Sequence, residues 1–178
     1  MINKRIIPVF VIFSFLFCQF DWIDDGAPIR QGQHIEWQRT AGDGLDGEII
    51  FAWSDTRDSM RDVYVQKLDS DGSKMWGENG IAVTTAYGRQ EDPLLVGDGQ
   101  GGAFVIWIDY RDEPDTKGDV YAQHVLSDGS LVWSLEGYPI VVKEGAQRSP
   151  NMCSDGEGGA YIIWKDFTVG QYENVYAT

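Results

Sequence analysis

The sequence predicts an all-β protein built from repeated, four-stranded antiparallel units. One segment recurs three times along the chain, and Asp-Gly turn signals separate the β-rich runs of each complete copy. No stretch of ten or more residues shows helical periodicity. Aromatic residues make up 13% of the 178 residues and glycine contributes 21 of them, a composition that suits strands joined by many turns.

The recurring segment is an apolar run that contains a tryptophan. This tryptophan appears as Trp53, Trp107 and Trp164, at spacings of 54 and 57 residues. We therefore divide residues 21–178 into the tail of a preceding unit, two complete repeats and one partial repeat. Their ranges are 22–42, 43–97, 98–154 and 155–178.

The second copy of the apolar run, "AFVIWI" at residues 103–108, is apolar on both of its alternating faces. A strand of this kind is expected to be buried from both sides. The run that follows it ends at Asp128-Gly129, a strong hairpin signal, and residues 131–133 and 138–142 complete the unit. Each repeat is thus predicted to form about four short strands.

A repeat of about 55 residues with four strands and no helix is typical of a β-propeller, in which one repeat forms one blade. Closed propellers have roughly 4–8 blades, so this chain forms an incomplete ring. We expect it to be a fragment of a larger protein, or a truncated reading frame, whose remaining blades lie in a longer chain. Completion of the ring by oligomerisation is the alternative, and a β-solenoid is disfavoured because its coils are shorter.

The N-terminal residues 1–20 are predicted to be a signal peptide. Lys4 and Arg5 precede an apolar stretch at 6–17, which is shorter than the roughly 20 residues that span a bilayer. We expect export to the extracellular space or cell surface, with the periplasm as the alternative, and no membrane insertion after cleavage. The cleaved bond and lipidation of Cys18 remain open, and a buried N-terminal element is the competing interpretation.

The chain is strongly acidic. Removal of residues 1–20 leaves 12 basic and 28 acidic side chains, a formal net charge of −16. Such a surface repels phosphate backbones and anionic lipid, so nucleic-acid and anionic-membrane binding are disfavoured.

The repeat core, "GDGQGGAFVIWIDYRD" followed by "DVYAQHVLSDGSLVW", resembles the tryptophan- and aspartate-rich β-propeller repeats of secreted bacterial surface proteins. The resemblance covers most of residues 22–178. It implies an exported, repeat-built propeller at the bacterial cell surface, usually without an assigned activity. The segment "SDGSLVW" at 127–133 is also distantly similar to the Asp-box of sialidase-type propellers, which is a structural turn, although glycine directly follows the aspartate here.

The block "WIDYRD" at 107–112 gathers groups that could carry chemistry. It recurs as "WSDTRD" at 53–58 and partly as "WKDFTV" at 164–169, and a residue needed in every repeat is most simply structural. At a period of two, Trp107, Asp109 and Arg111 lie on one face of a strand. Asp109 is therefore expected to bind backbone N–H groups or to pair with an arginine such as Arg111.

No catalytic, cofactor-binding or metal-ligating set is predicted. His34 and His124 belong to no zinc-like cluster, and His124 is expected at a solvent-accessible strand position. "DSDG" at 69–72 is interpreted as a turn, with calcium binding left open. The mature chain retains Cys153, which alone cannot form an intramolecular disulfide and is expected to be an inert core thiol.

The insert "EPDTKG" at 113–118 lengthens the loop after "WIDYRD" relative to "SMR" at 59–61. Loop variation on a repeat scaffold is where binding specificity usually lies, although neutral drift is equally compatible with it. The sequence therefore favours a non-enzymatic module for binding or surface interaction, with an unknown protein or glycan ligand. The alternative is part of a glycan-processing, sialidase-like propeller hydrolase.

Overall fold

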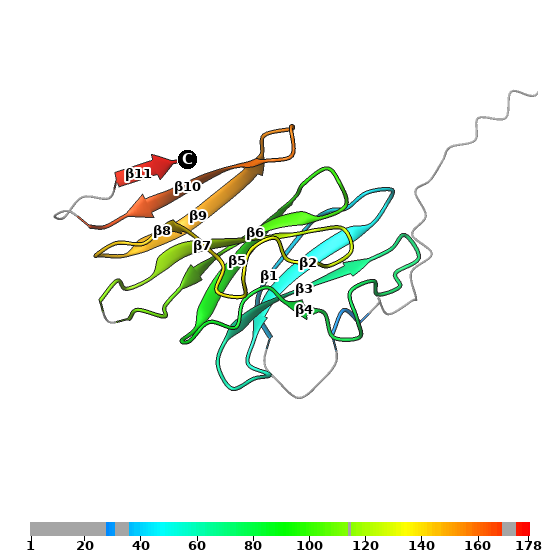
Figure 1. The fold of residues 1–178 in the computed structure, drawn as a ribbon, viewed down its shortest axis with the longest axis horizontal. Helices are drawn as coiled ribbons and strands as arrows, with labels where there is room; N and C mark the ends of the chain where they lie inside the picture. The colour runs from blue at the N-terminus through cyan, green and yellow to red at the C-terminus, as the bar shows by residue number, and fades with distance from the viewer. Residues whose placement is uncertain (1–27, 31–35, 114, 169–173) are drawn as a thin grey trace, which may run out of the picture.

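The computed structural model describes residues 28–30, 36–113, 115–168 and 174–178 (Figure 1). The predicted signal peptide, with Cys18, and His34 lie outside these residues. The described part of the chain is all β, as predicted, and it contains no helix that could cross a membrane. The strands are β1 (Glu36–Asp43), β2 (Ile49–Asp55), β3 (Asp62–Leu68), β4 (Ile81–Ala82), β5 (Gln90–Gly97), β6 (Ala103–Asp109), β7 (Asp119–Val125), β8 (Tyr138–Val141), β9 (Gln147–Ser154), β10 (Ala160–Asp166) and β11 (Asn174–Ala177).

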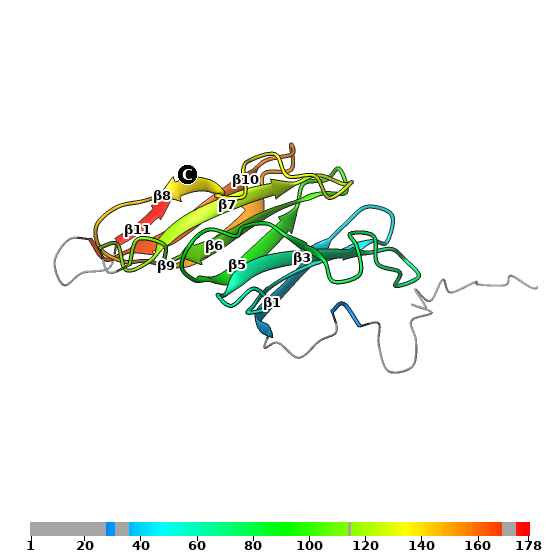
Figure 2. The ribbon, with the colours of Figure 1, turned by 60° about the horizontal axis from the view of Figure 1, so that its bottom comes forward.

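The strands form three separate antiparallel sheets, each from a continuous part of the chain. The first sheet has the order β1-β2-β3-β4, the second β5-β6-β7-β8 and the third β9-β10-β11. The sheets follow one another across the molecule, from the cyan strands through the green strands to the orange and red strands (Figures 1 and 2). Antiparallel pairing between neighbours suits the short turns that join them.

Two apolar layers hold the three sheets together. One layer lies between the first and second sheets and includes Ile50, Val65 and Trp107. The other lies between the second and third sheets and includes Ile106 and Trp164. The middle sheet therefore packs on both of its faces.

Strand β6 confirms the expectation of a strand buried from both sides. Its side chains at Val105 and Trp107 join the first apolar layer, whereas those at Ile106 and Ile108 join the second. All four are at most 2% exposed. Alternation along a strand sends neighbouring side chains to opposite faces, so a continuous apolar run is needed in the middle of such a stack.

The equivalent strand of the third sheet, β10, has only one buried face. Ile162 and Trp164 pack against the second sheet, but Tyr161 and Ile163 on the other face are 61% and 44% exposed. Val175 on β11 is 70% exposed. The third sheet therefore has an open outer face, defined here by Tyr161, Ile163 and Val175.

Cys153 corrects one sequence-based prediction. Its side chain is exposed rather than buried in the core. It lies on β9 opposite Tyr161, which places it on the open outer face. The expectation of a core thiol assumed that this face is covered, as the corresponding face of the second sheet is.

The fourth strand of the second unit differs in extent from the sequence-based expectation. Residues 131–133 form no strand; Leu131 makes only an isolated bridge with Val125. The edge strand is β8, which pairs with β7. Trp133 instead packs its ring against the second apolar layer, so burial of the indole outweighs continued pairing.

Strands β5 and β9 carry matching irregularities near their first residues. Asp92 and Ser149 adopt left-handed backbone conformations, with φ of 53° and 50°. Pro93 and Pro150 follow them, and proline is tolerated in strands at such interruptions because it donates no hydrogen bond. These interruptions bend β5 and β9 where a cavity opens between the sheets.

Candidate functional site

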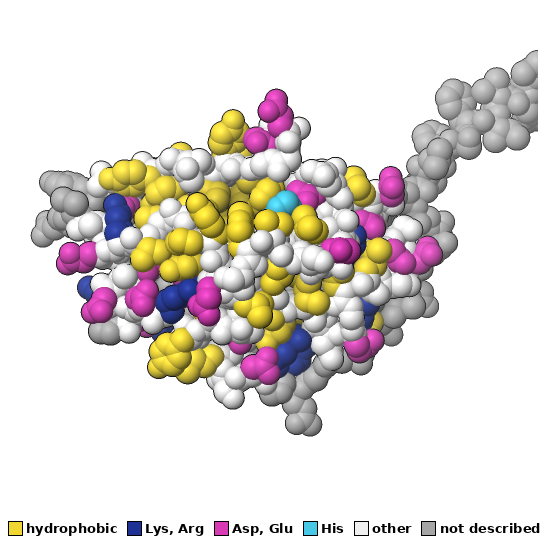
Figure 3. All heavy atoms as spheres, viewed as in Figure 1, with side chains coloured by type: hydrophobic (Ala, Val, Ile, Leu, Met, Phe, Trp, Pro, Cys, Tyr) yellow, Lys and Arg dark blue, Asp and Glu magenta, His cyan; other side chains and the backbone are white. Residues whose placement is uncertain are grey.

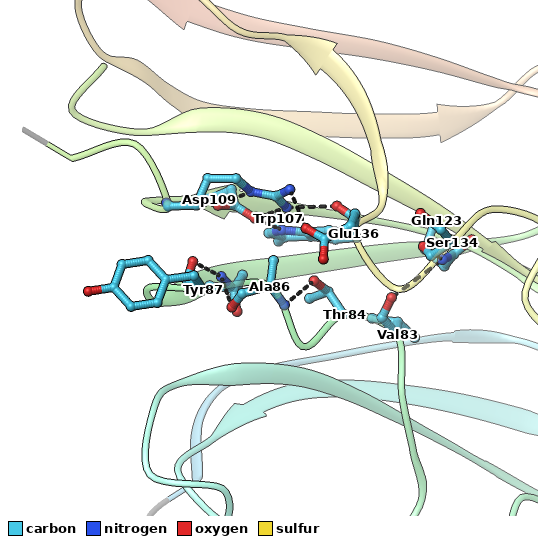
Figure 4. Close-up of polar contacts among 11 residues, drawn as sticks. Val83, Thr84, Ala86, Tyr87, Trp107, Asp109, Gln123, Ser134 and Glu136 are labelled. Carbon is cyan, nitrogen blue, oxygen red and sulfur yellow. Dashed lines mark hydrogen bonds and ion pairs between the residues drawn. The ribbon is translucent and has the colours of Figure 1, made fainter. Parts of the chain in front are cut away.

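The "WIDYRD" block forms a closed polar cluster in the second sheet (Figure 4). Asp109 is fully buried, and its carboxylate accepts hydrogen bonds from Trp107 Nε1 (2.9 Å) and from the backbone N–H of Arg111 (2.9 Å). The Arg111 guanidinium donates to both carboxylate oxygens of Asp109, at 2.9 and 2.7 Å. It also donates to the backbone oxygen of Glu136 at 2.7 Å and lies 4.0 Å above the ring of Tyr121.

These contacts shift the protonation equilibrium of Arg111. Burial lowers the pKa of Arg111, but the hydrogen bonds and negative charge of Asp109 outweigh burial and raise the pKa above its usual value. The guanidinium therefore stays charged and the ion pair intact. A carboxylate enclosed by its own strand and turn is a structural anchor and is not free to touch a ligand.

The first sheet repeats the arrangement with its own residues. Asp55 accepts from Trp53 Nε1 (2.9 Å) and from the backbone N–H of Arg57 (2.9 Å), and the Arg57 side chain donates to both of its oxygens. Arg57 lies 3.7 Å above the ring of Tyr64. Burial raises the pKa of Asp55, but the bonds from Arg57 and Trp53 outweigh it and leave the pKa lowered.

The third sheet keeps the carboxylate but takes its cation from elsewhere. Thr168 occupies the arginine position and donates its backbone N–H to Asp166 at 2.7 Å. Lys143, from the loop between β8 and β9, forms an ion pair with Asp166 and lies 5.0 Å above the ring of Tyr176. The cation over the tyrosine is therefore retained, while Trp164 Nε1 is buried without a hydrogen-bond partner among the described residues.

His124 is less accessible than the sequence suggested. Its side chain is 18% exposed, its ring stacks on Phe104 with centroids 4.2 Å apart, and Nε2 lies 2.9 Å from Asp98 Oδ2. Burial raises the pKa of Asp98, but bonds from His124 and from two backbone N–H groups outweigh it and lower the pKa. The exchange of Lys67 for His124 keeps a side-chain contact with a carboxylate, because Lys67 pairs with Glu48 at 3.1 Å.

The "DSDG" segment forms the turn that its sequence predicts. Asp69 Oδ1 accepts from the backbone N–H groups of Asp71 (3.0 Å) and Ser73 (2.8 Å), and Gly72 has a φ of 81°. Within the described ranges, no group of three or more His, Cys, Asp or Glu residues is arranged to hold a metal ion. The oxygen of Asp69 serves the turn itself.

A cavity of about 770 Å³ lies between the second and third sheets, where β5 and β9 are bent. Leu94, Ile108 and Tyr110 form its wall on the second sheet. The insert contributes Glu113 and Lys117. Arg89, Asp92, Pro93, Arg148, Ser149 and Pro150 complete the lining.

Three cations meet at this cavity, and they differ in their partners. Arg89 lies 3.9 Å above the ring of Tyr110 and pairs with Glu91 (3.3 Å) and Glu113 (3.2 Å). Lys117 and Arg148 are exposed, and neither forms an ion pair within the described part of the chain. The cavity therefore offers one fixed arginine and two uncompensated positive charges.

The sequence identified only part of this site. It singled out the insert, and the structure places Glu113 and Lys117 from the insert at the cavity. It noted Tyr110 only as part of "WIDYRD", without placing it at a cavity, and it missed Arg148; the two residues reach the cavity from different sheets. The available signal was the charge reversal between repeats, since Arg148 occupies the position that Glu91 holds in the preceding unit.

Acidic side chains are spread along the edges of the molecule, and hydrophobic side chains occupy much of the middle of the face in Figure 3. Three cations and two carboxylates line the cavity, so the positive charges are in excess there although the chain is acidic. No family model matches the chain, and comparisons with curated proteins and with solved structures find no similar protein. The candidate site therefore rests on its geometry and charge.

Proposed function

We propose that this protein is an exported, non-enzymatic β-propeller repeat module that binds a ligand at the cavity between its second and third sheets. The observation that carries the proposal is the lining of that cavity by the insert at 113–118, the segment in which the two complete repeats differ most in length. A repeated scaffold with a variable loop at a hollow is the usual arrangement of a binding module. The apolar N-terminal stretch supports export.

The propeller part of the proposal is supported by the packing of the three sheets. The second and third sheets each take their first strand from the end of one repeat and their other strands from the next repeat. Each sheet packs face to face on its neighbour, as propeller blades do. The open outer face at Tyr161, Ile163 and Val175 corresponds to the face of β6 that the third sheet covers. We infer that a further blade of a longer chain covers it, because exposed apolar sheet faces favour association.

Cys153 provides a test of this packing. In an extended chain, a second copy of residues 122–178 would follow Tyr176. The added residues would complete the third sheet and form a fourth sheet beyond it. The copy of Cys153 would be replaced by serine, so that Cys153 itself is the thiol that reacts. We expect Ellman's reagent to label Cys153 several-fold more slowly in the extended chain than in the present one, because the new sheet shields the thiol. Ile163→Lys in the extended chain should restore fast labelling; equal rates in both chains would contradict face-to-face stacking.

A loop exchange tests the binding part of the proposal. Replacement of residues 113–118 by Ser-Met-Arg, the loop at 59–61, restores a length that the first sheet already accommodates. We expect the exchanged variant to keep its melting temperature within a few degrees and to lose binding to the glycans that the native chain recognises on a printed array. Identical binding profiles for the two chains would show that the cavity is not the site.

The competing function, a glycan-processing propeller hydrolase, makes a different prediction in the same experiment. Steady release of the fluorophore from a fluorogenic sialoside, lost in the exchanged variant, would favour it. The wall of the cavity offers Asp92 and Glu113 as its carboxylates.

A further inference from the structure

We propose that the cavity between β5 and β9 binds an anionic carbohydrate, a sugar chain that carries carboxylate groups. This inference rests on the proposed binding function and specifies its ligand. Its basis is the meeting of two uncompensated cations, an aromatic ring and short polar side chains at one hollow.

The charges select an anion. The chain has a formal net charge of −14, yet Lys117 and Arg148 face the same cavity and pair with no described carboxylate. An arginine presents a planar set of donors that matches a carboxylate in a two-pronged contact. A ligand carboxylate would therefore supply the counter-charge that the protein itself does not.

The remaining wall suits a sugar ring. Tyr110 lines the cavity, and its orientation is fixed because the Arg89 guanidinium covers one face of its ring at 3.9 Å and is itself anchored by Glu113. Leu94 adds partly exposed apolar surface. Apolar walls with a few placed polar groups are typical of small-ligand sites, and the C–H faces of sugars pack on such surfaces.

Hydroxyl recognition can come from the same lining. Ser149 offers a hydroxyl that both donates and accepts, and the carboxylates of Asp92 and Glu113 accept hydrogen bonds. A carbohydrate has donors for these acceptors, whereas a fully deprotonated anion such as sulfate has none. The combination of cations and acceptors thus favours a hydroxylated anion.

Two other polyanions fit less well. Nucleic acid binds through many phosphate contacts, and this cavity supplies only two uncompensated cations beside the carboxylates of Asp92 and Glu113. An acidic peptide would bind most simply by pairing with a strand edge. The interruptions at Asp92 and Ser149 break the regular ladder at this cavity and oppose such pairing.

The test is calorimetric titration of the purified full chain with an oligogalacturonate. We expect binding that weakens with added salt and that is lost when the carboxylates of the probe are methyl-esterified. The variant Lys117→Asn/Arg148→Gln should weaken binding by about tenfold or more, since charge-assisted bonds are among the strongest available. Asparagine is chosen because Lys117 has a φ of 58°, which asparagine tolerates.

Lys74→Gln provides a charge-matched control for Arg148→Gln. Lys74 pairs with Glu78 at 2.7 Å, and neither residue lines the cavity, so its loss should leave oligogalacturonate binding unchanged. Equal weakening by Lys74→Gln and Arg148→Gln, undiminished binding of the esterified probe, or absence of binding would overturn the proposal. Tighter binding of polyglutamate would identify an acidic peptide instead. If the glycan array shows loop-dependent binding of neutral sugars only, the binding function stands and the anionic ligand is wrong.

Discussion

Substitution of Asp109 by alanine is expected to lower the free energy of unfolding by about 3–5 kcal/mol, the range for breaking a buried ion pair by removing one partner. Asp109 is fully buried, and it binds Trp107 Nε1 and the guanidinium of Arg111. Its loss leaves the indole N–H of Trp107 without its acceptor and the Arg111 guanidinium with Glu136 as its remaining partner. Urea unfolding followed by tryptophan fluorescence measures the change.

Asp128→Ala is the matched control for this substitution. Asp128 also accepts a hydrogen bond from the backbone N–H two residues ahead, at 2.8 Å from Ser130, but it lies in an exposed turn. Its removal is expected to change the free energy of unfolding far less than removal of Asp109 does, because water replaces the lost contact. Similar losses for Asp109→Ala and Asp128→Ala would contradict the anchor role. A stable Asp109→Ala variant that no longer binds ligand would make "WIDYRD" part of the binding site.

Short-range patterns in the sequence predicted most of the strands and their buried faces. The apolar run of β6 predicted burial on both faces because side-chain direction alternates along any strand. The same alternation placed Trp107, Asp109 and Arg111 on one face, and the structure joins all three. Features set by neighbours within a few residues are thus readable from sequence alone.

Features set by packing between sheets were not readable. The cavity is lined by residues from two different sheets, so the placement of Tyr110 and Arg148 at the same cavity could not be inferred from their spacing in the sequence. The exposure of Cys153 likewise depends on which sheet is last in the stack.

The replacement of arginine by threonine in "WKDFTV" is a second case in which a contact with a distant segment could not be predicted from the sequence. In the sequence, Thr168 breaks the pairing of aspartate with arginine. In the structure, Lys143 supplies the missing charge to Asp166 from the preceding loop. The requirement is therefore a cation near the carboxylate, and the sequence position of that cation is free to vary.

The buried carboxylate of Asp62 is expected to lower the stability of the folded protein, whereas the carboxylate of Asp109 raises it. Asp62 is 4% exposed, and no cation offsets its burial among the causes of its pKa shift. Burial, followed by the negative charges of Asp58, Asp55 and Asp109, raises the pKa of Asp62 to about 6. The third sheet carries the neutral Asn174 at the equivalent position, opposite Asp166.

Asp62→Asn should therefore stabilise the protein above pH 6. A folded-state pKa raised above the unfolded value gives stability that is fully present below about pH 4 and is lost as the pH rises through 6. The shift corresponds to about 3 kcal/mol, since one pKa unit is about 1.4 kcal/mol. Asparagine retains the neutral form at every pH, so unfolding free energies of the two proteins should converge near pH 4 and differ by about 2–3 kcal/mol at pH 8. Asp71→Asn, at an exposed turn residue, controls for the change in net charge. A pH-independent difference between Asp62→Asn and the native chain would show that the carboxylate of Asp62 is not held in an unfavourable charged state.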